Sequence, residues 1–82
     1  MATRKDVWLG VLGESCDITA SQIRKKITGK VCLRFHHDWE CIEDTVTYNE
    51  NLIRFEGQNR SSQDVTTFLL WDDIHAVEVT LE

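Results

Sequence analysis

Apolar and polar residues alternate through most of the chain from Lys30 onwards, in runs separated by short polar segments. A period of two is typical of strands that bury one face. The second run is long for a strand, so we expect a bend or bulge near Glu43–Thr45. We expect turns at His37-Asp38, Asn49-Glu50 and Asp72-Asp73, and a polar loop over Gly57–Asp64. The pattern predicts five strands, over Lys30–His36, Trp39–Tyr48, Asn51–Glu56, Val65–Trp71 and Ile74–Leu81.

The pattern before Lys30 has a longer period. Ile23 and Ile27 lie four residues apart, which predicts a helix over Thr19–Ile27 that Thr19 or Ser21 caps and Gly29 ends. Residues 1–18 are ambiguous, and we favour a short helix over a strand. That helix would be capped by Asp6 and carry Val7, Trp8, Val11 and Leu12, although Gly10 and Gly13 weaken it.

Short consecutive strands joined by tight turns predict an antiparallel meander that closes into a small barrel. The expected fold is therefore mostly β, with residues 1–18 as an N-terminal extension and residues 19–82 as a barrel domain with its N-terminal helix. The 82 residues leave room for one domain. A chain of this size buries only about 60% of its unfolded surface, so neighbouring subunits would help to stabilise it.

The charge is unevenly distributed along the chain. The net charge is -5 overall, with seven basic and three acidic residues in 1–34 and two basic and 11 acidic residues in 35–82. An acidic barrel is a poor general binder of polyanions. The basic cluster of Arg24, Lys25 and Lys26 still offers a local patch for phosphate, with a solvated helix face as the alternative.

The sequence also indicates a cellular setting. The apolar run Val7–Leu12 is short and interrupted, so we expect no signal peptide, and no run is long enough to cross a membrane. Three cysteines, Cys16, Cys32 and Cys41, form an odd set without the spacing of a disulfide framework. We therefore expect reduced, metal-free thiols and a cytoplasmic location.

Three segments together resemble the Sm-like family, which includes eukaryotic Sm and LSm proteins and bacterial Hfq. Ile27–Phe35 is similar to the helix exit and first strand, Tyr48–Phe55 to the end of the first Sm motif, and Trp71–Val79 to the short second motif. The resemblance covers about residues 20–82. It implies a five-stranded antiparallel Sm-like (SH3-like) barrel that assembles into a homo-oligomeric ring and binds single-stranded RNA at its pore.

The residues expected to hold RNA depart from the family pattern. Asn49 stands where the first motif has Asp, and Trp71, Asp72 and Asp73 stand where Hfq has a basic pair before the equivalent of Ile74. Asn amides can read base edges and a Tyr ring can stack on bases. The candidate RNA-binding residues are Tyr48, Asn49, Asn51 and His75, together with Arg24, Lys25 and Lys26.

The cysteines and histidines around the first expected turn could form a catalytic or a metal site. Cys41 lies near His36, His37 and Asp38, but no Gly-rich oxyanion turn accompanies them, so we expect no enzyme activity. Cys32, His36 and Cys41 could face one side of a hairpin and hold zinc, but their spacing matches no standard zinc motif. We expect neither a metal nor a cofactor.

The run Val65–Trp71 has no charge and no proline to protect it as an edge strand. Alternation sends Phe68 and Leu70 to one face and Leu69 and Trp71 to the other, so one face needs a cover. The expected interface residues are Phe68, Leu69, Leu70, Trp71, Val77 and Val79, with the N-terminal extension as a competing cover. Two hypotheses remain, an RNA-binding ring and a protein-interaction or structural oligomer without a nucleic-acid role.

Overall fold

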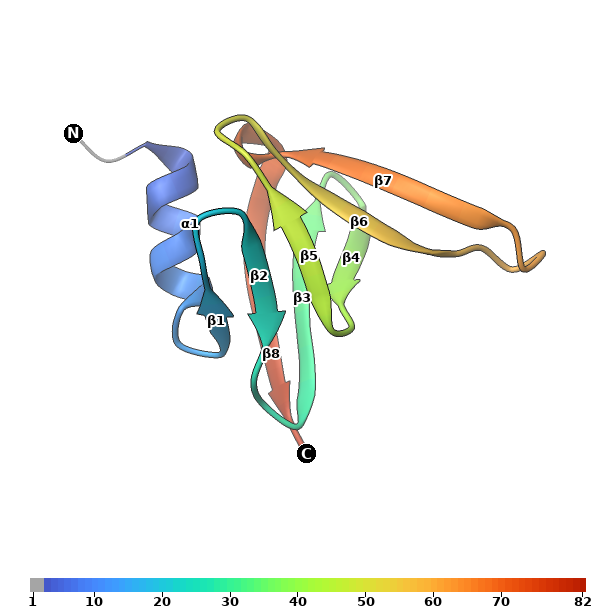
Figure 1. The fold of residues 1–82 in the computed structure, drawn as a ribbon, viewed down its shortest axis with the longest axis horizontal. Helices are drawn as coiled ribbons and strands as arrows, with labels where there is room; N and C mark the ends of the chain where they lie inside the picture. Colours follow the sequence, from blue (N-terminus) through green and yellow to red (C-terminus); the bar gives the residue numbers. More distant parts are fainter. Residues whose placement is uncertain (1–2) are drawn as a thin grey trace.

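The computed structural model of the protein describes residues 3–82, which form one N-terminal helix and eight strands (Figure 1). The elements in chain order are α1 (Arg4–Leu12), β1 (Cys16–Ile18), β2 (Gln22–Lys25), β3 (Gly29–Phe35), β4 (Asp38–Ile42), β5 (Thr45–Tyr48), β6 (Leu52–Gln58), β7 (Asp64–Leu70), the 3-10 turn η1 (Trp71–Asp73) and β8 (Ile74–Leu81). The expected mostly β fold with an N-terminal helix is confirmed.

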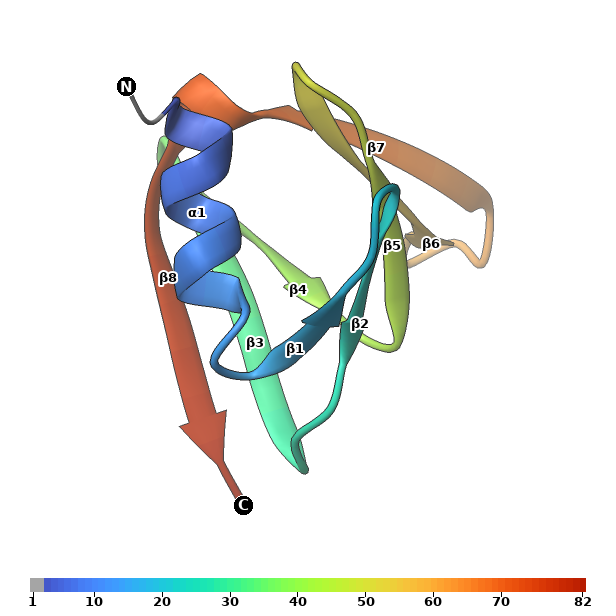
Figure 2. The same cartoon turned by 60° about the vertical axis from the view of Figure 1, so that its left-hand side comes forward.

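The strands form two open antiparallel sheets and not one closed barrel. The larger sheet has the order β1-β2-β5-β6-β7, and the smaller has the order β4-β3-β8. Figure 2 shows the two sheets on either side of the interior. α1 packs against η1 and β1. The edge strands β1, β7, β4 and β8 each lack a neighbouring strand on one side.

The expected long second strand is present and bent. It consists of β4 and β5 with Glu43 and Asp44 between them, at the position where a bend was expected. β4 pairs with β3 in the smaller sheet, whereas β5 pairs with β2 and β6 in the larger one. The bend carries the chain from one sheet to the other and thereby links them.

The N-cap of the N-terminal helix is Thr3, three residues before the expected cap Asp6. The Thr3 hydroxyl accepts from the Asp6 amide at 3.2 Å, and the Asp6 carboxylate accepts from the Thr3 amide at 3.3 Å. This reciprocal arrangement is a capping box. Asp6 therefore completes the cap from the third helical position.

The helix predicted over Thr19–Ile27 is wrong, because that segment contains the end of a hairpin. β1 and β2 pair with each other, and Ile23 of β2 lies opposite Val46 of β5. Thr19 does act as a cap, but of the turn between the strands, where its hydroxyl accepts from the Gln22 amide at 3.2 Å. Pairing with β5 supplies the backbone hydrogen bonds that an isolated nine-residue helix would have had to make internally.

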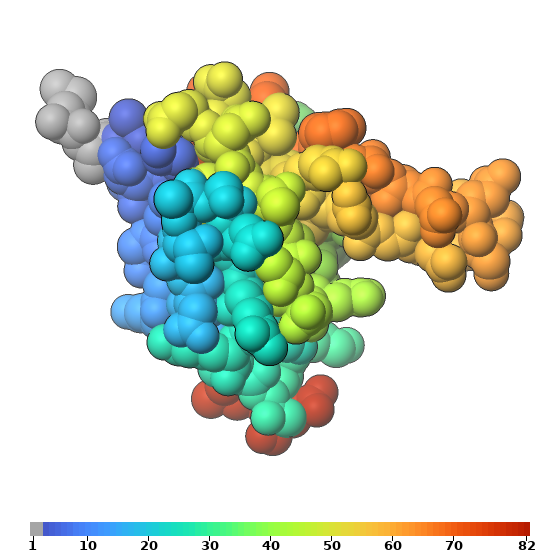
Figure 3. All heavy atoms as spheres, viewed as in Figure 1, coloured from blue at the N-terminus to red at the C-terminus, as the bar shows by residue number. Residues whose placement is uncertain are grey.

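Several strand boundaries also differ from expectation. The first hairpin turns at His36–His37, one residue before the expected position, with Phe35 opposite Asp38. The expected loop over Gly57–Asp64 is shorter, because β6 runs to Gln58 and β7 starts at Asp64. The β6–β7 hairpin consequently projects from the body of the molecule, as Figure 3 shows.

The interior is built from residues of both sheets and the helix. Ile23, Leu33, Ile42 and Ile53 are fully buried, and Leu12 closes the core from the end of α1. Two of the cysteines lie directly opposite each other on β3 and β4 and form the disulfide Cys32–Cys41. The expectation of three reduced thiols is therefore wrong: Cys16 alone is a free, buried thiol.

Candidate interaction surface

The outer face of the β6–β7 hairpin carries large apolar side chains in solvent. β7 is an edge strand, and Phe68 is 60% exposed while Leu70 is 47% exposed. Leu52 lies opposite Leu70 on the same face and is half-buried. These three residues, which share one face of the hairpin, define what we call the β7 surface.

The alternation along β7 explains this exposure. Leu69 is only 3% exposed and packs in the core, so its neighbours Phe68 and Leu70 must point outward. Trp71 is also buried, because the chain leaves the strand there and enters η1. Leu69 and Trp71 thus belong to the core of this chain, while Phe68 and Leu70 remain available at its surface.

The backbone of β7 is unpaired along the outer edge of the sheet. Asn59 donates to the Gln63 carbonyl at 3.1 Å, which marks this pair as hydrogen-bonded in the β6–β7 ladder. Hydrogen-bonded pairs alternate along an antiparallel ladder, so the peptide groups of Thr66, Phe68 and Leu70 face away from β6. They point toward the open edge of the sheet.

β8 provides a second free edge. Glu82 donates to the Thr28 carbonyl at 3.1 Å, so the same alternation turns the peptide groups of Val77, Val79 and Leu81 away from β3. Val79 is 46% exposed and Leu81 is 74% exposed, whereas Val77 is half-buried. We call these three residues the β8 surface.

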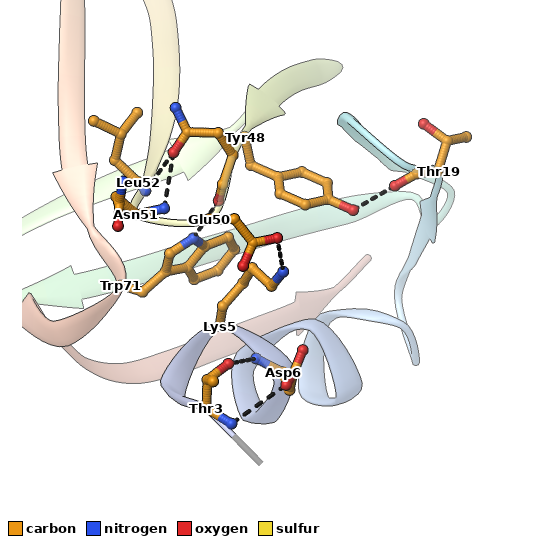
Figure 4. Close-up of polar contacts among 10 residues, drawn as sticks. Thr3, Lys5, Asp6, Thr19, Tyr48, Glu50, Asn51, Leu52 and Trp71 are labelled. Atoms are coloured by element: carbon orange, nitrogen blue, oxygen red, sulfur yellow. Dashed lines mark hydrogen bonds and ion pairs between the residues drawn. The ribbon is translucent and has the colours of Figure 1, made fainter. Parts of the chain in front are cut away.

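η1 joins the two edge strands and is firmly anchored. The indole Nε1 of Trp71 donates to the Asn49 carbonyl at 2.9 Å, and the Trp71 amide donates to the Asn51 carbonyl at 3.1 Å. The Tyr48 ring meets the Trp71 ring edge to face, with centroids 5.9 Å apart (Figure 4). These contacts hold the connection between β7 and β8 against the β5–β6 turn.

The residues expected to contact RNA around Tyr48 are engaged within the chain. The Tyr48 hydroxyl donates to the Thr19 carbonyl (Figure 4). The Asn49 side-chain oxygen accepts from the amides of Asn51 and Leu52, at 2.8 and 3.1 Å. Asn49 and Tyr48 therefore hold the β5–β6 turn in place.

The expected basic cluster lies at the other end of the same strands. β2 and β5 run antiparallel with Gln22 opposite Thr47 and Arg24 opposite Thr45, which separates Arg24 from the Tyr48 turn. Arg24 approaches Asp44 at 3.9 Å, and Lys25 donates to the Gly29 carbonyl at 2.7 Å. Lys26 is exposed. The structure does not bring this cluster to the turn.

His75 lies on a third part of the surface. It is exposed at the start of β8, and its ring meets that of His36 with centroids 6.0 Å apart. The candidate RNA-binding residues are thus divided among three separate locations, and no continuous basic groove connects them in the described part of the chain.

The disulfide excludes Cys32 and Cys41 from the nucleophilic and zinc-binding roles considered above. Cys32 and Cys41 have no thiolate to attack a substrate or to ligate zinc while they are bonded to each other. Burial raises the pKa of the remaining Cys16 thiol, which keeps it protonated at neutral pH. Residues 3–82 hold no group of three side chains arranged to bind a metal ion.

Between β4 and β6 lies a hollow lined by carboxylates, which the sequence analysis did not identify. Its lining includes Glu40, Glu43, Asp44 and Glu56. Burial, and secondly the charge of Glu43, raise the pKa of the Glu40 carboxyl. The closely spaced acidic residues Glu40, Glu43 and Asp44 were the available sequence signal for this feature.

Comparisons with protein-family models, with curated proteins and with solved structures found no match. Across residues 3–82, none of the helical segments combines the length and apolar character needed to cross a bilayer.

Proposed function

We propose that this chain is a self-associating protein-interaction module, in which β7 of one copy pairs with β8 of the next. The observation that carries the proposal is the exposure of Phe68 and Leu70 beside a row of unpaired peptide groups on β7. Exposed flat edges of this kind are templates for pairing with another strand. Covering one large apolar side chain is worth roughly 1.5–3 kcal/mol, which would support a domain of this size.

The two edges are different surfaces of one chain, so their contact is heterologous. A heterologous contact repeated from copy to copy forms a ring if the rotation closes. β7 and β8 follow each other in the sequence, and the η1 turn that joins them is held to the β5–β6 turn by the hydrogen bonds of Trp71. We propose that this connection favours one angle between successive copies, and that this angle closes a ring of defined size.

The strand order supports an Sm-like assignment for residues 29–81. The path β3, bent β4–β5, β6, β7, 3-10 turn and β8 follows the order of five strands that the sequence resemblance implies. The β1–β2 hairpin stands where that resemblance places a helix, so the member that we propose is an atypical one.

The alternative function, an RNA-binding ring, receives less support. Residues 35–82 carry a net negative charge, and Tyr48 and Asn49 already have partners within the chain. Phosphate contacts supply most of the affinity of general RNA binders, so an acidic surface works against them. Protein–protein contact through the β7 and β8 surfaces is therefore the function that we favour.

Size-exclusion chromatography with light scattering, at micromolar concentration, tests the proposal. We expect a mass several times the 9.5 kDa of one chain for the wild type, and a monomer for Phe68→Asp. Val7→Asp is the matched control, because Val7 is 53% exposed on α1, outside the β7 and β8 surfaces. It should leave the mass unchanged.

A parallel titration with labelled U-rich and A-rich oligonucleotides distinguishes the two functions. Salt-dependent binding that is lost when Arg24, Lys25 and Lys26 are replaced together by Ala would favour the RNA-binding ring. A wild-type mass equal to that of one chain would refute self-association.

A further inference from the structure

The carboxylate-lined hollow between β4 and β6 is a groove of about 270 Å³. A second hollow of about 140 Å³ shares Glu40, Phe55, Gly57 and Gln58 with it, so the two extend each other. In Figure 1 the β6–β7 hairpin reaches outward beyond β4. The groove therefore lies between an edge strand of the smaller sheet and the overhanging hairpin of the larger one.

The backbone of β4 is unpaired on the groove side. β4 is an edge strand, and Phe35 and Asp38 are the closing pair of a two-residue hairpin. The closing pair of such a hairpin is hydrogen-bonded, so the peptide groups of Trp39 and Cys41 face away from β3 by alternation. They form a short row of free donors and acceptors.

The far half of β6 presents a second open edge to the same groove. The β5–β6 register covers Thr47–Arg54 and Tyr48–Ile53, whereas the β6–β7 register continues to Gln58–Asp64. Beyond Arg54, β6 thus has β7 on one side and the groove on the other. An extended segment in the groove would meet strand backbone on both sides.

Glu40 gives the groove its chemical preference. Alternation places Glu40 on the same face of β4 as Ile42, which is 1% exposed, so its carboxylate points toward the interior beneath the hairpin. Burial raises its pKa, and the nearby charge of Glu43 adds to the effect. A positive charge in the groove would offset both effects, because it favours the ionised form of the carboxyl.

The remaining lining residues strengthen this preference. Asp44 and Glu56 have arginine partners at 3.9 and 2.7 Å, but neither Arg24 nor Arg54 lines the groove, and no other basic side chain does so among the described residues. Glu40 and Glu43 are left as the negative charges available to a partner. Inward-pointing charges can also serve to block an edge strand, which is the competing explanation for Glu40.

We infer that this groove binds an extended, positively charged segment of a partner protein, which adds to β4 as a fourth strand of the smaller sheet. Strand addition provides affinity through main-chain hydrogen bonds and specificity through alternate side chains. Lysine or arginine at alternate positions would reach Glu40 and Glu43, and apolar residues would cover Phe55 and Val65. The site is separate from the β7 and β8 surfaces and does not depend on self-association.

Selection from a phage-displayed library of random nonapeptides tests the inference. We expect the enriched peptides to carry lysine or arginine at alternate positions. A titration of ¹⁵N-labelled protein with the most enriched peptide should shift and protect the amides of Trp39 and Cys41. Binding should weaken steeply with salt, because charge pairs near the surface are screened.

Two pairs of variants locate the site. Glu43→Lys should lower the affinity for the peptide by about fivefold. Glu14→Lys makes an equal change of charge at an exposed residue outside the groove and should leave that affinity unchanged. A side chain at Gly57 would enter the groove, since Gly57 lines both hollows and a Cβ there meets nothing within 4 Å. Gly57→Leu should therefore abolish binding, while Gly10→Leu, whose Cβ also meets nothing within 4 Å, should preserve it.

The inference is overturned if no peptide is enriched above an uncoated control, or if the enriched peptides are neutral or acidic. Peptides that bind equally well to Glu43→Lys, or that shift the amides of β7 and β8 instead, also overturn it. Phe68→Asp separates the two proposals, because it should abolish self-association and leave peptide binding intact.

Discussion

Breaking the disulfide between Cys32 and Cys41 should destabilise the protein substantially. The two residues are nine apart in the sequence, and they tie the edge strand β4 to the central strand β3. In the chain-entropy model, closing a loop of about ten residues restricts the unfolded state by about 2.5–3 kcal/mol. For a domain of this size each kcal/mol corresponds to a shift of about 4–8 °C, so the melting temperature should fall by about 10–20 °C.

Thermal unfolding followed by circular dichroism, with and without a dithiol reductant, measures this effect at one fixed protein concentration. The double variant Cys32→Ala/Cys41→Ala is the control, since its melting temperature should be low and unaffected by the reductant. Alkylation in denaturant without reductant, followed by mass spectrometry, should modify one thiol, that of Cys16. Alkylation of three thiols, or a melting temperature unchanged by demonstrated reduction, would refute the reasoning.

Four further substitutions test the fold. Gly29→Ala should lower the free energy of unfolding by about 2 kcal/mol or more in urea, because φ at Gly29 is +143° and a Cβ would lie 2.0 Å from a backbone oxygen of β8. Gly10→Ala, in helix α1, should instead raise the free energy of unfolding by about 0.5–1 kcal/mol. Tyr48→Phe removes the hydroxyl that bonds to the β1–β2 turn and should cost about 1 kcal/mol in the same assay. The pKa of Glu40 is raised, so the protein should lose stability as pH rises through that pKa, and Glu40→Gln should remove this loss in a pH series of melting curves.

The strand pattern could be predicted where alternation and turn chemistry act locally. The last strand was predicted over Ile74–Leu81 and is observed there, and the bend between β4 and β5 was predicted near Glu43–Thr45. Both depend on features within a few residues of each other. The outward orientation of Phe68 and Leu70 follows from the same alternation and is confirmed by their exposure.

The disulfide was missed because the odd number and the spacing of the cysteines favour free thiols, and because a one-residue error in a turn concealed their pairing. A turn at His37-Asp38 places His36 opposite Trp39 and leaves Cys32 and Cys41 out of register. The actual turn at His36–His37, with His36 at φ 52°, places the two cysteines directly opposite each other. A shift of this size changes every cross-strand pair of a hairpin.

The β1–β2 hairpin and the true roles of Tyr48 and Asn49 depend on contacts that are distant in the sequence. Ile23 and Ile27 fit one face of a short helix, yet β2 obtains its partner from β5, more than 20 residues later. Tyr48 bonds to Thr19 across 29 residues. Local periodicity carries no information about such pairs, so these residues resembled a binding site until their partners were known.

Amide hydrogen exchange at two protein concentrations tests the pairing of β7 with β8 most directly. The relevant amides face the free edges of the single chain and belong to Thr66, Phe68, Leu70, Val77, Val79 and Leu81. Self-association through these edges predicts slow exchange at high concentration that accelerates on dilution and in Phe68→Asp, on both strands together. Fast exchange on both strands at every concentration, or protection of one strand alone, would contradict it.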